Sequence, residues 1–353
     1  MSLSGVLSQR KESILRSILD EYIVSAVPVA SEAVTRRPGM GVSPATVRHE
    51  MAALEEEGYI TRSHASSGGA PTAKGYRYYV ESLWGEREVP IGRKQAIRRR
   101  FRRAGPDVDT WTRLAARMLA DMTHNMAVAT FPRSLSSRVR QVQLVYLHDL
   151  LVMLVLVLEE ARLYKELVPL EEPVDRDELV RVGNRVNAHV SGLSRQDILD
   201  SAAGGSPLEQ QVLAEVLRVL QDGERAAAAD YLTEGLRHLL AQPEFAASAR
   251  ALEIVDALES QRLVQAILEE NPAAGEVRVL IGEENRLDAL KPLGVVLAQY
   301  GVPGGMTGLV GILGPMRMEY GGTVAGVQWL SAMLSELVAG VQAPPATPWL
   351  ERP

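Results

Sequence analysis

The chain of 353 residues contains no cysteine, and that absence removes several classes of protein at once. Without thiols there is no disulfide bond, no thiolate nucleophile and no zinc site built on cysteine. The six histidines are scattered, and none of the spacings HxH, HxxxH or HExxH that bring two metal ligands together occurs. We therefore predict no metal site, no bound cofactor and no catalytic residue.

Long apolar runs are missing as well. The longest, Leu150 to Leu158, has nine residues, whereas a membrane-spanning helix needs about 20. The opening MSLSGVLSQRKE lacks the basic segment followed by an apolar segment that directs secretion. We therefore expect a cytoplasmic protein that does not bind membranes.

Positive charge is scarce overall but concentrated in one part of the chain, whose net charge is −6. Residues 1–105 carry 17 Lys and Arg against 11 Asp and Glu, a balance of +6, and the remainder carries 21 against 33, a balance of −12. Much of the excess lies in one run: Arg93, Lys94, Arg98, Arg99, Arg100, Arg102 and Arg103. This run is either a solvated face or a source of sequence-independent attraction for phosphates, and the two are compatible.

The chain does contain a helix with an explicit start. Ser43 is able to accept a hydrogen bond from a free backbone N–H, and Pro44 follows at the first helical position, where no N–H is needed. Val47, Met51 and Leu54 then recur at i, i+4 and i+7, so one face of the helix packs inward.

The opposite face of this helix carries Ala45, Thr46, Arg48 and His49 near its N-terminal end. A helix-turn-helix protein places that end of its second helix in the major groove of DNA. Polar side chains there suit contacts with bases and phosphates. An ordinary amphipathic helix with a solvated face shows the same pattern, so this segment alone leaves both interpretations open.

The flanking residues favour the DNA-binding interpretation. Upstream, an apolar stripe of helical period predicts a supporting helix: Ile14, Leu15, Ile18, Leu19, Tyr22 and Ile23. Downstream, residues 59–62 read as a short strand and residues 63–72 as a loop of small residues with the length of a hairpin. This order of elements predicts a winged helix over residues 1–83, with the wing over the DNA backbone or minor groove.

Three strings in the chain are similar to one known family. They are SPATVRHEMAALEEEGYI at 43–60, SHASSGGAPTAKGYRYYV at 63–80 and ILGPMRMEY at 312–320. Together they resemble the HrcA family of bacterial heat-shock repressors, and the resemblance covers most of residues 8–338. His49 stands where that family usually carries Asn, and Ala70 where it usually carries Arg. An imidazole cannot bond adenine bidentately as an amide does, so these departures concern the operator sequence more than DNA binding itself.

The resemblance implies a negative regulator of chaperonin-type heat-shock operons. Such a repressor binds double-stranded DNA as a homodimer at an inverted repeat, the CIRCE operator, because two-fold protein symmetry asks for two-fold DNA symmetry. The resemblance also implies that a GroEL-type chaperonin keeps the repressor active and that heating inactivates it. We expect the DNA contacts to come from ten residues: Ser43, Ala45, Thr46, Arg48, His49, Arg62, His64, Ser66, Lys74 and Arg77.

The rest of the chain reads as an α+β protein of several domains. A basic linker is predicted over 84–106. Strands are predicted at 139–147, 150–158 and 162–170 as an antiparallel meander, and again at 276–281, 294–300 and 308–313 after a helical block. The residues themselves support an α+β domain with a mostly helical insertion. The resemblance implies a GAF-like domain over 107–174 and 262–340, interrupted by a dimerisation insert over 175–261. The proline-rich residues 341–353 are predicted to be a disordered tail.

Within the predicted insert, an apolar stripe lies on the helix expected at 206–221. As candidate dimerisation residues we single out Leu213, Val216, Leu217 and Leu220. Such a stripe is more often part of a core than of an interface, so both interpretations remain open.

Two C-terminal features have a structural interpretation. Arg317 follows Gly-Pro in an apolar segment, and a buried arginine there needs a carboxylate or carbonyl partner, which favours an internal clamp over a ligand contact. Glu283 and Glu284 would point to opposite faces of a strand, which disfavours joint acid–base chemistry and favours a structural turn.

Two other functions stay open. A small-molecule effector in the GAF-like domain would gate a winged-helix regulator, and a pocket with converging polar side chains would favour that function. An enzyme with an appended winged helix is less in keeping with the sequence, and a cleft with converging His, Asp or Glu side chains would favour it.

Overall fold

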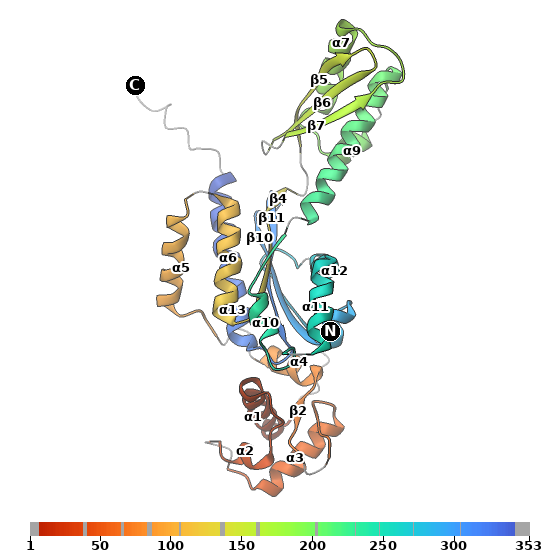
Figure 1. Cartoon of the computed structure of the whole chain (residues 1–353). Coiled ribbons are helices and arrows are strands. Elements are labelled where there is room, and N and C mark those ends of the chain that lie inside the picture. The colour runs from red at the N-terminus through yellow and green to blue at the C-terminus, as the bar shows by residue number, and fades with distance from the viewer. Residues whose placement is uncertain are drawn as a thin grey trace, which may run out of the picture. The chain divides into compact units, whose positions relative to one another are not determined.

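A computed structural model of the chain shows a mixed α/β protein whose described strand pairings in sheets are antiparallel (Figure 1). It describes residues 7–37, 41–64, 67–82, 87–105, 107–134, 138–159, 163–201, 204–229, 231–246, 248–270, 272–303 and 305–342. The chain forms two compact units. The first contains Met1–Pro132, Tyr231–Gly301 and Gly308–Pro353, and the second contains Arg133–Asp230 and Val302–Thr307. The second unit is therefore an insertion in the first.

The first unit begins with an N-terminal module, residues 7–82. Its elements are α1 (Gln9–Ser25), α2 (Ser31–Thr35), α3 (Pro44–Glu56), the strands β1 (Ile60–Thr61) and β2 (Ala70–Pro71), and α4 (Ala73–Ser82). The strands pair in an antiparallel hairpin. The predicted stripe on α1 is the centre of the module, because Ile14, Leu15, Ile18 and Leu19 are fully buried. At Gly75 a Cβ atom would lie 2.3 Å from the carbonyl oxygen of Tyr59, so only glycine allows α4 to approach the hairpin this closely.

The rest of the first unit is built on an antiparallel sheet in the strand order β8-β3-β11-β10-β9. The strands are β3 (Met126–Thr130), β8 (Tyr231–Glu234), β9 (Val277–Ile281), β10 (Leu293–Gly301) and β11 (Met306–Pro315), and β4 (Arg133–Ser134) pairs with the first two residues of β11. Short 3-10 turns at Gly282–Glu284 and Asp288–Leu290 join β9 to β10. β10 is buried over nearly all its length, which requires helices on both faces of the sheet.

Those helices form two layers. On one face lie α6 (Val108–Thr123) and α13 (Tyr320–Gln342), which pack on β3 and β10 and on each other, with α5 (Ile91–Arg103) against α6 (Figure 1). On the other face lie α10 (Leu236–Leu240), α11 (Ala249–Glu259) and α12 (Arg262–Glu269), whose buried side chains share a core with the sheet. The elements of this core are held together chiefly by apolar burial, worth about 25 cal/mol per Å².

One described helix, α13, is long and apolar enough to cross a membrane by length and composition. Here it is a core helix, because Val327, Leu330, Leu334 and Val338 are at most 1% exposed and the helix covers β10.

The second unit contains the predicted meander. Its strands are β5 (Val139–His148), β6 (Leu151–Leu158) and β7 (Leu163–Pro169), and its helices are α7 (Arg176–Val190), α8 (Arg195–Asp200) and α9 (Pro207–Ala229). The three strands pair antiparallel in their own sheet, as the short turns predicted. One face of this sheet packs against α7 and α9 around a buried cluster that includes Val152, Leu154, Leu156 and Val216.

The boundaries of the insertion differ from those predicted. We expected the meander in the split sheet domain and the insertion over 175–261, but the meander belongs to the second unit and residues 231–261 belong to the first. The reason is pairing: β8 lies beside β3, with Ala127 opposite Glu234, whereas β5, β6 and β7 pair only among themselves. Local periodicity shows that a segment is a strand but not which sheet it joins.

Two further segments bear on the predicted boundaries. The predicted basic linker, 84–106, contains the 13-residue helix α5, whose Ile97 and Phe101 are buried, so it is a packed element and not only a connection. Of the predicted tail, α13 includes residues 341 and 342, and residues 343–353 lie outside the described residues.

Candidate nucleic-acid interface and its junction with the sheet

The start of α3 has the cap that its sequence predicts. The Ser43 side chain accepts a hydrogen bond from the backbone N–H of Thr46 at 3.2 Å, and its hydroxyl lies 3.0 Å from that of Thr46. Pro44 occupies the first helical position. The cap satisfies one of the N–H groups that a helix start leaves free, and the positive end of the helix dipole is directed toward solvent there.

The two faces of α3 also separate as predicted. Val47, Met51 and Leu54 are at most 2% exposed and pack inside the module. On the other face Ser43, Ala45, Arg48 and His49 are exposed, and Thr46 is half-buried. Five of the ten expected DNA-contacting residues therefore lie together at the leading end of one helix.

Arg48 is held by α2 without being buried. Its Nη2 atom lies 3.2 Å from Oε1 of Glu32, its Nε donates to Ser31 Oγ at 3.3 Å, and the side chains of the ion pair are 60% and 53% exposed. The bond from its own backbone N–H, and then the bond from Arg48, lower the pKa of the Glu32 carboxyl. An ion pair this exposed contributes little stability, so the guanidinium is available to a phosphate or a base.

Arg62, which we expected to contact DNA, has a largely buried side chain. Its side chain is only 7% exposed, its Nε and backbone N–H donate to the two carboxylate oxygens of Glu55 at 2.9 and 3.1 Å, and Nη2 donates to the same carboxylate. The pair ties β1 to the last turn of α3. This geometry gives Arg62 a structural role in the module.

The two cations on α4 are also engaged elsewhere. Lys74 donates to the carbonyl of Glu57 at 2.7 Å and lies 4.4 Å from the centre of the Tyr59 ring, so it caps the C-terminal end of α3, opposite the exposed end. Arg77 pairs with Glu284 and donates to the carbonyl of Val279 at 2.7 Å. Both contacts differ from the DNA contacts that we expected.

The loop after β1 carries the remaining candidates. His64 is exposed, and its backbone N–H donates to Ser67 Oγ at 2.9 Å. Ser66 lies outside the described residues. The loop is anchored at its far side, where Val29 and Gly69 exchange two backbone hydrogen bonds of 2.9 Å. The hairpin is therefore fastened to the connection between α1 and α2.

Arg317 is the internal clamp that its sequence context predicted. It is 12% exposed and comes from the turn between β11 and α13. Its guanidinium donates to Glu244 Oε1 at 2.6 Å, to Gln242 Oε1 at 2.8 Å and to the carbonyl of Ile23 at 2.9 Å. That carbonyl is one of the last four of α1, which have no partner inside the helix. This side chain, in the turn after β11, thus joins the last turn of α1 to the loop after α10.

We call the region where the N-terminal module contacts the rest of the first unit the junction. A second set of contacts lies there, where Arg77 of α4 reaches the turn after β9. Glu284, which pairs with Arg77, also accepts the backbone N–H of Ile281 at 2.8 Å, so the carboxylate is fixed on both sides. The acidic pair at 283 and 284 is therefore structural, as interpreted from the sequence. At Gly282, where φ is +60°, a Cβ atom would lie 3.0 Å from the Cβ of Ala73, so the turn meets α4 without room for a side chain.

Two tyrosines fill the centre of this junction. Tyr76 of α4 and Tyr320 at the start of α13 are each 1% exposed, and their ring centres are 6.2 Å apart. Burial raises the pKa of both hydroxyls, and neither hydroxyl has a hydrogen-bond partner within the described part of the chain. An unbonded buried hydroxyl costs free energy, so the packing of the rings must offset that cost.

The strings PTAKGYRYYV and GPMRMEY supply both halves of the junction, since α4 comes from the first and Arg317, Glu319 and Tyr320 come from the second. The sequence identified each string as unusual but gave no sign that they meet. Their partners Gln242 and Glu244 were not singled out at all, because an acid and an amide in a loop carry no local signal.

The expected dimerisation residues lie in the core of the insertion. Val216 is 0% and Leu220 is 3% exposed, and Leu213 and Leu217 are partly buried against the same cluster. The stripe on α9 packs on the meander, which corrects our choice of these side chains as an interface. The physical reason is that a sheet with three apolar strands needs a cover on at least one face.

The other face of the meander, which we call the open face, is partly apolar. Its apolar members are Val145 of β5, Leu151, Met153, Val155 and Val157 of β6, and Leu163 and Leu167 of β7, and the polar Gln141, Gln143 and Lys165 lie on the same face. Val145 and Leu167 lie on either side of Met153 and are 37% and 56% exposed, and Leu163 is 53% exposed. An exposed apolar patch of this kind is typical of an interaction surface.

Within the described ranges, no three side chains of His, Asp or Glu lie close enough to hold a metal ion. The acids at the junction are engaged by arginines, as Glu284 and Glu244 show.

The clamp gives a direct prediction about stability. Arg317→Gln should lower the free energy of unfolding by about 2–3 kcal/mol, because it leaves the carboxylate of Glu244 half-buried without its partner. Amide hydrogen exchange should accelerate in the last turn of α1 but not in α9. Arg87→Gln is the matched control: its pair with Glu319 is 54% and 45% exposed, so the loss should stay below about 1 kcal/mol. Equal losses in the two variants would contradict a special role for Arg317.

Comparison with known proteins gives one family. The family described as "HrcA protein C terminal domain" matches residues 109–324. A curated "Heat-inducible transcription repressor HrcA" from Dehalococcoides mccartyi is 36% identical over 340 residues, which cover 96% of this chain and 98% of that protein. The protein of the same name from Thermomicrobium roseum is 34% identical over 343 residues, covering 97% and 99%.

Among solved structures, the "Crystal structure of a hypothetical protein at 2.2 A resolution" is similar over 95% of this chain and 99% of that chain, with a TM-score of 0.62 and 20% identity. At that identity the likeness concerns the fold alone.

Proposed function

The chain belongs to the HrcA family of heat-inducible transcription repressors, and from this premise we propose how its parts perform repression. It is a repressor of heat-shock genes and not an enzyme. In the proposal, the N-terminal module is a winged helix that reads an inverted-repeat operator of the CIRCE type, the sheet of the first unit is a GAF-like domain, and the insertion joins two copies. The protein acts in the cytoplasm, where its operator is.

The exposed leading end of α3 is the observation that supports the DNA-binding part of this proposal. A capped helix start, with Arg48 and His49 on the free face and Val47 and Met51 buried behind them, is suited to the major groove. The backbone N–H groups and the helix dipole at the same end favour a phosphate. Ser43, Ala45 and Thr46 complete the proposed contact set, with His64 on the hairpin as the wing contact. We propose no DNA contact for Arg62, Lys74 or Arg77.

The contrast between two arginines tests this assignment. Arg48→Ala should weaken operator binding by about 1–3 kcal/mol while leaving the melting temperature nearly unchanged, because its ion pair with Glu32 is exposed. Arg62→Ala should lower the melting temperature, because it removes the buried partner of Glu55. The measurements are operator binding by fluorescence anisotropy and thermal unfolding by circular dichroism.

A random duplex of the same length is the control for the DNA. Loss of affinity that is equal on operator and random DNA would make Arg48 a phosphate contact and not a base reader. A large loss of stability in Arg48→Ala would instead support the other interpretation of α3, an ordinary amphipathic helix with a solvated face.

For dimerisation, we propose that the open face of the meander meets the same face of a second copy. Its exposed apolar members are Val145, Leu163 and Leu167, and a self-complementary patch is what two-fold symmetry requires. Two joined copies would present two winged helices to an inverted repeat, so self-association and operator affinity are linked.

Substitutions on that face separate the interface from the core. Val145→Glu or Leu167→Glu should convert the dimer to a monomer and weaken operator binding, with the melting temperature of the insertion retained. Val180→Glu is the matched control, because Val180 is 59% exposed on α7, outside the open face. Sedimentation at micromolar concentration provides the measurement. A monomeric wild type, or dimers in all three variants, would exclude the open face.

Thermal control is the last part of the proposal. Heating should abolish operator binding irreversibly over a narrow range, as the junction opens and apolar surface aggregates. A GroEL-type chaperonin with ATP should raise the binding-competent fraction without joining the DNA complex. An effector acts differently, since its influence reverses when it is removed.

The experiment is to heat the protein, cool it, and assay operator binding with and without chaperonin. Poor recovery alone and improved recovery with chaperonin are expected. Full recovery on cooling without chaperonin would contradict the proposed circuit.

A further inference from the structure

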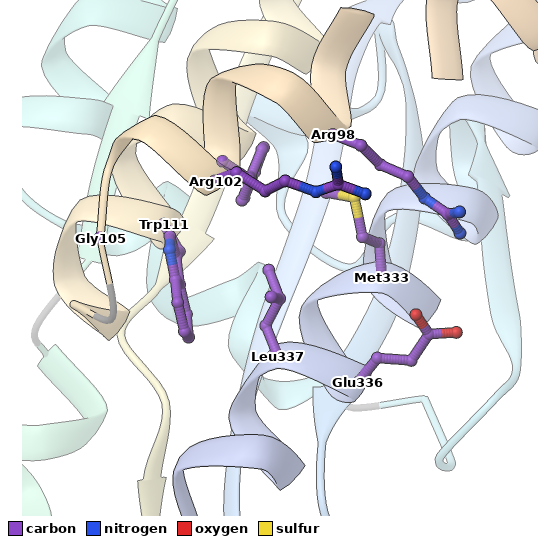
Figure 2. A pocket seen from close by; sticks show the side chains of 8 residues that line it. Arg98, Arg102, Gly105, Trp111, Met333, Glu336 and Leu337 are labelled. Carbon is purple, nitrogen blue, oxygen red and sulfur yellow. The ribbon is translucent and has the colours of Figure 1, made fainter. Parts of the chain in front are cut away.

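A pocket lies between α5, α6 and α13, and nothing in the repression circuit uses it. Its volume is about 440 Å³, within the range of small-molecule sites. Figure 2 shows Arg102 extending from α5 over the space between Trp111 and Met333, with Leu337 below, and Arg98 extending farther out on the side of Met333 and Glu336.

The inner wall of the pocket is apolar. Phe101, Trp111 and Met333 are each no more than 6% exposed, and Leu337 is half-buried beside them. The indole N–H of Trp111 is buried and has no hydrogen-bond partner among the described residues. Buried polar atoms in native proteins are nearly always bonded, so this donor is an unexplained group in the pocket wall.

The mouth of the pocket carries excess positive charge. Arg98 and Arg102 are four residues apart on α5 and therefore share one face of the helix. Neither forms an ion pair with a described Asp or Glu, whereas Lys94 of the same helix pairs with Glu88. Glu336 is the single acid in the lining and forms no ion pair with either arginine, so the lining keeps a net charge of about +1.

We propose that this pocket binds a monocarboxylate with an apolar body, the chemistry of a medium-chain fatty acid. The two guanidinium groups would hold the carboxylate, because Arg offers paired donors that match its two oxygens. The apolar body would lie against Phe101, Met333 and Leu337. A neutral molecule leaves the arginines without a partner, and a molecule of high negative charge meets Glu336.

Because of the position of the pocket in the fold, a bound ligand would affect the thermal stability of the chain. α5 follows the N-terminal module in the chain, and its contact with α6 and α13 is lined by this pocket. A ligand that binds only the folded chain raises its melting temperature as its concentration rises. A carboxylate in this pocket would therefore shift the temperature at which repression is lost.

Octanoate is the probe, with the full chain in isothermal titration calorimetry and no DNA present. We expect saturable binding of one octanoate per chain. Arg98→Gln and Arg102→Gln should each weaken it about three- to tenfold, the worth of an exposed charge-assisted hydrogen bond. Glu336→Gln should tighten it, because a competing negative charge is removed. Octanoate should also raise the melting temperature of the wild type and do so less in Arg98→Gln.

Arg99→Gln is the matched control, since Arg99 is exposed on the same helix but does not line the pocket, and its affinity should stay within about twofold of the wild type. Octan-1-ol has the same apolar body without the carboxylate and should bind more weakly. Absence of saturable binding, equal affinity for octan-1-ol, or wild-type affinity in both Arg98→Gln and Arg102→Gln would overturn the proposal. Operator binding without octanoate is measured separately, so a failure here does not bear on the repressor function.

Discussion

The attachment of the N-terminal module to the rest of the first unit centres on the hydrogen bonds of one arginine. Arg317 holds the last turn of α1, the loop after α10 and its own turn before α13 with a single guanidinium. Around it, Arg77 on Glu284 and the packed rings of Tyr76 and Tyr320 complete the junction. The partners come from distant parts of the chain. We therefore expect the contacts to be cooperative, because polar networks can contribute more together than singly.

The composition of this junction also suggests a physical cause for the heat response. It combines half-buried ion pairs with two tyrosine hydroxyls that have no bonding partner in the described structure. A contact surface of this kind is expected to open before the cores do, since local opening begins where buried apolar contact is least. The N-terminal module, which we propose reads DNA, would then lose its fixed relation to the rest of the unit while still folded.

The charged residues are also distributed unevenly along the chain. The basic run on α5 carries the positive excess, because residues 1–90 hold 10 Lys and Arg against 11 Asp and Glu, and the acidic remainder is spread over the sheet and the insertion. Within the module, however, Arg62 and Lys74 serve the structure, because α3 must be fixed before its free face has a defined shape. Arginine therefore has two roles in the module. The Arg62 side chain is 7% exposed and serves the structure, whereas the Arg48 side chain is 60% exposed and is available to a partner.

The sequence by itself determined the cap at Ser43, the buried stripe of α3, the meander strands and the clamp role of Arg317, because each rests on neighbours in the chain or on the cost of an unpaired buried charge. Only the tertiary structure decided that β8 joins β3, that the meander lies in the insertion, that Val216 faces the core, and that Arg77 meets Glu284. These are pairings between segments far apart in the chain. Local patterns determine what an element is, and the choice among partners of similar character is settled only when all of them pack at once.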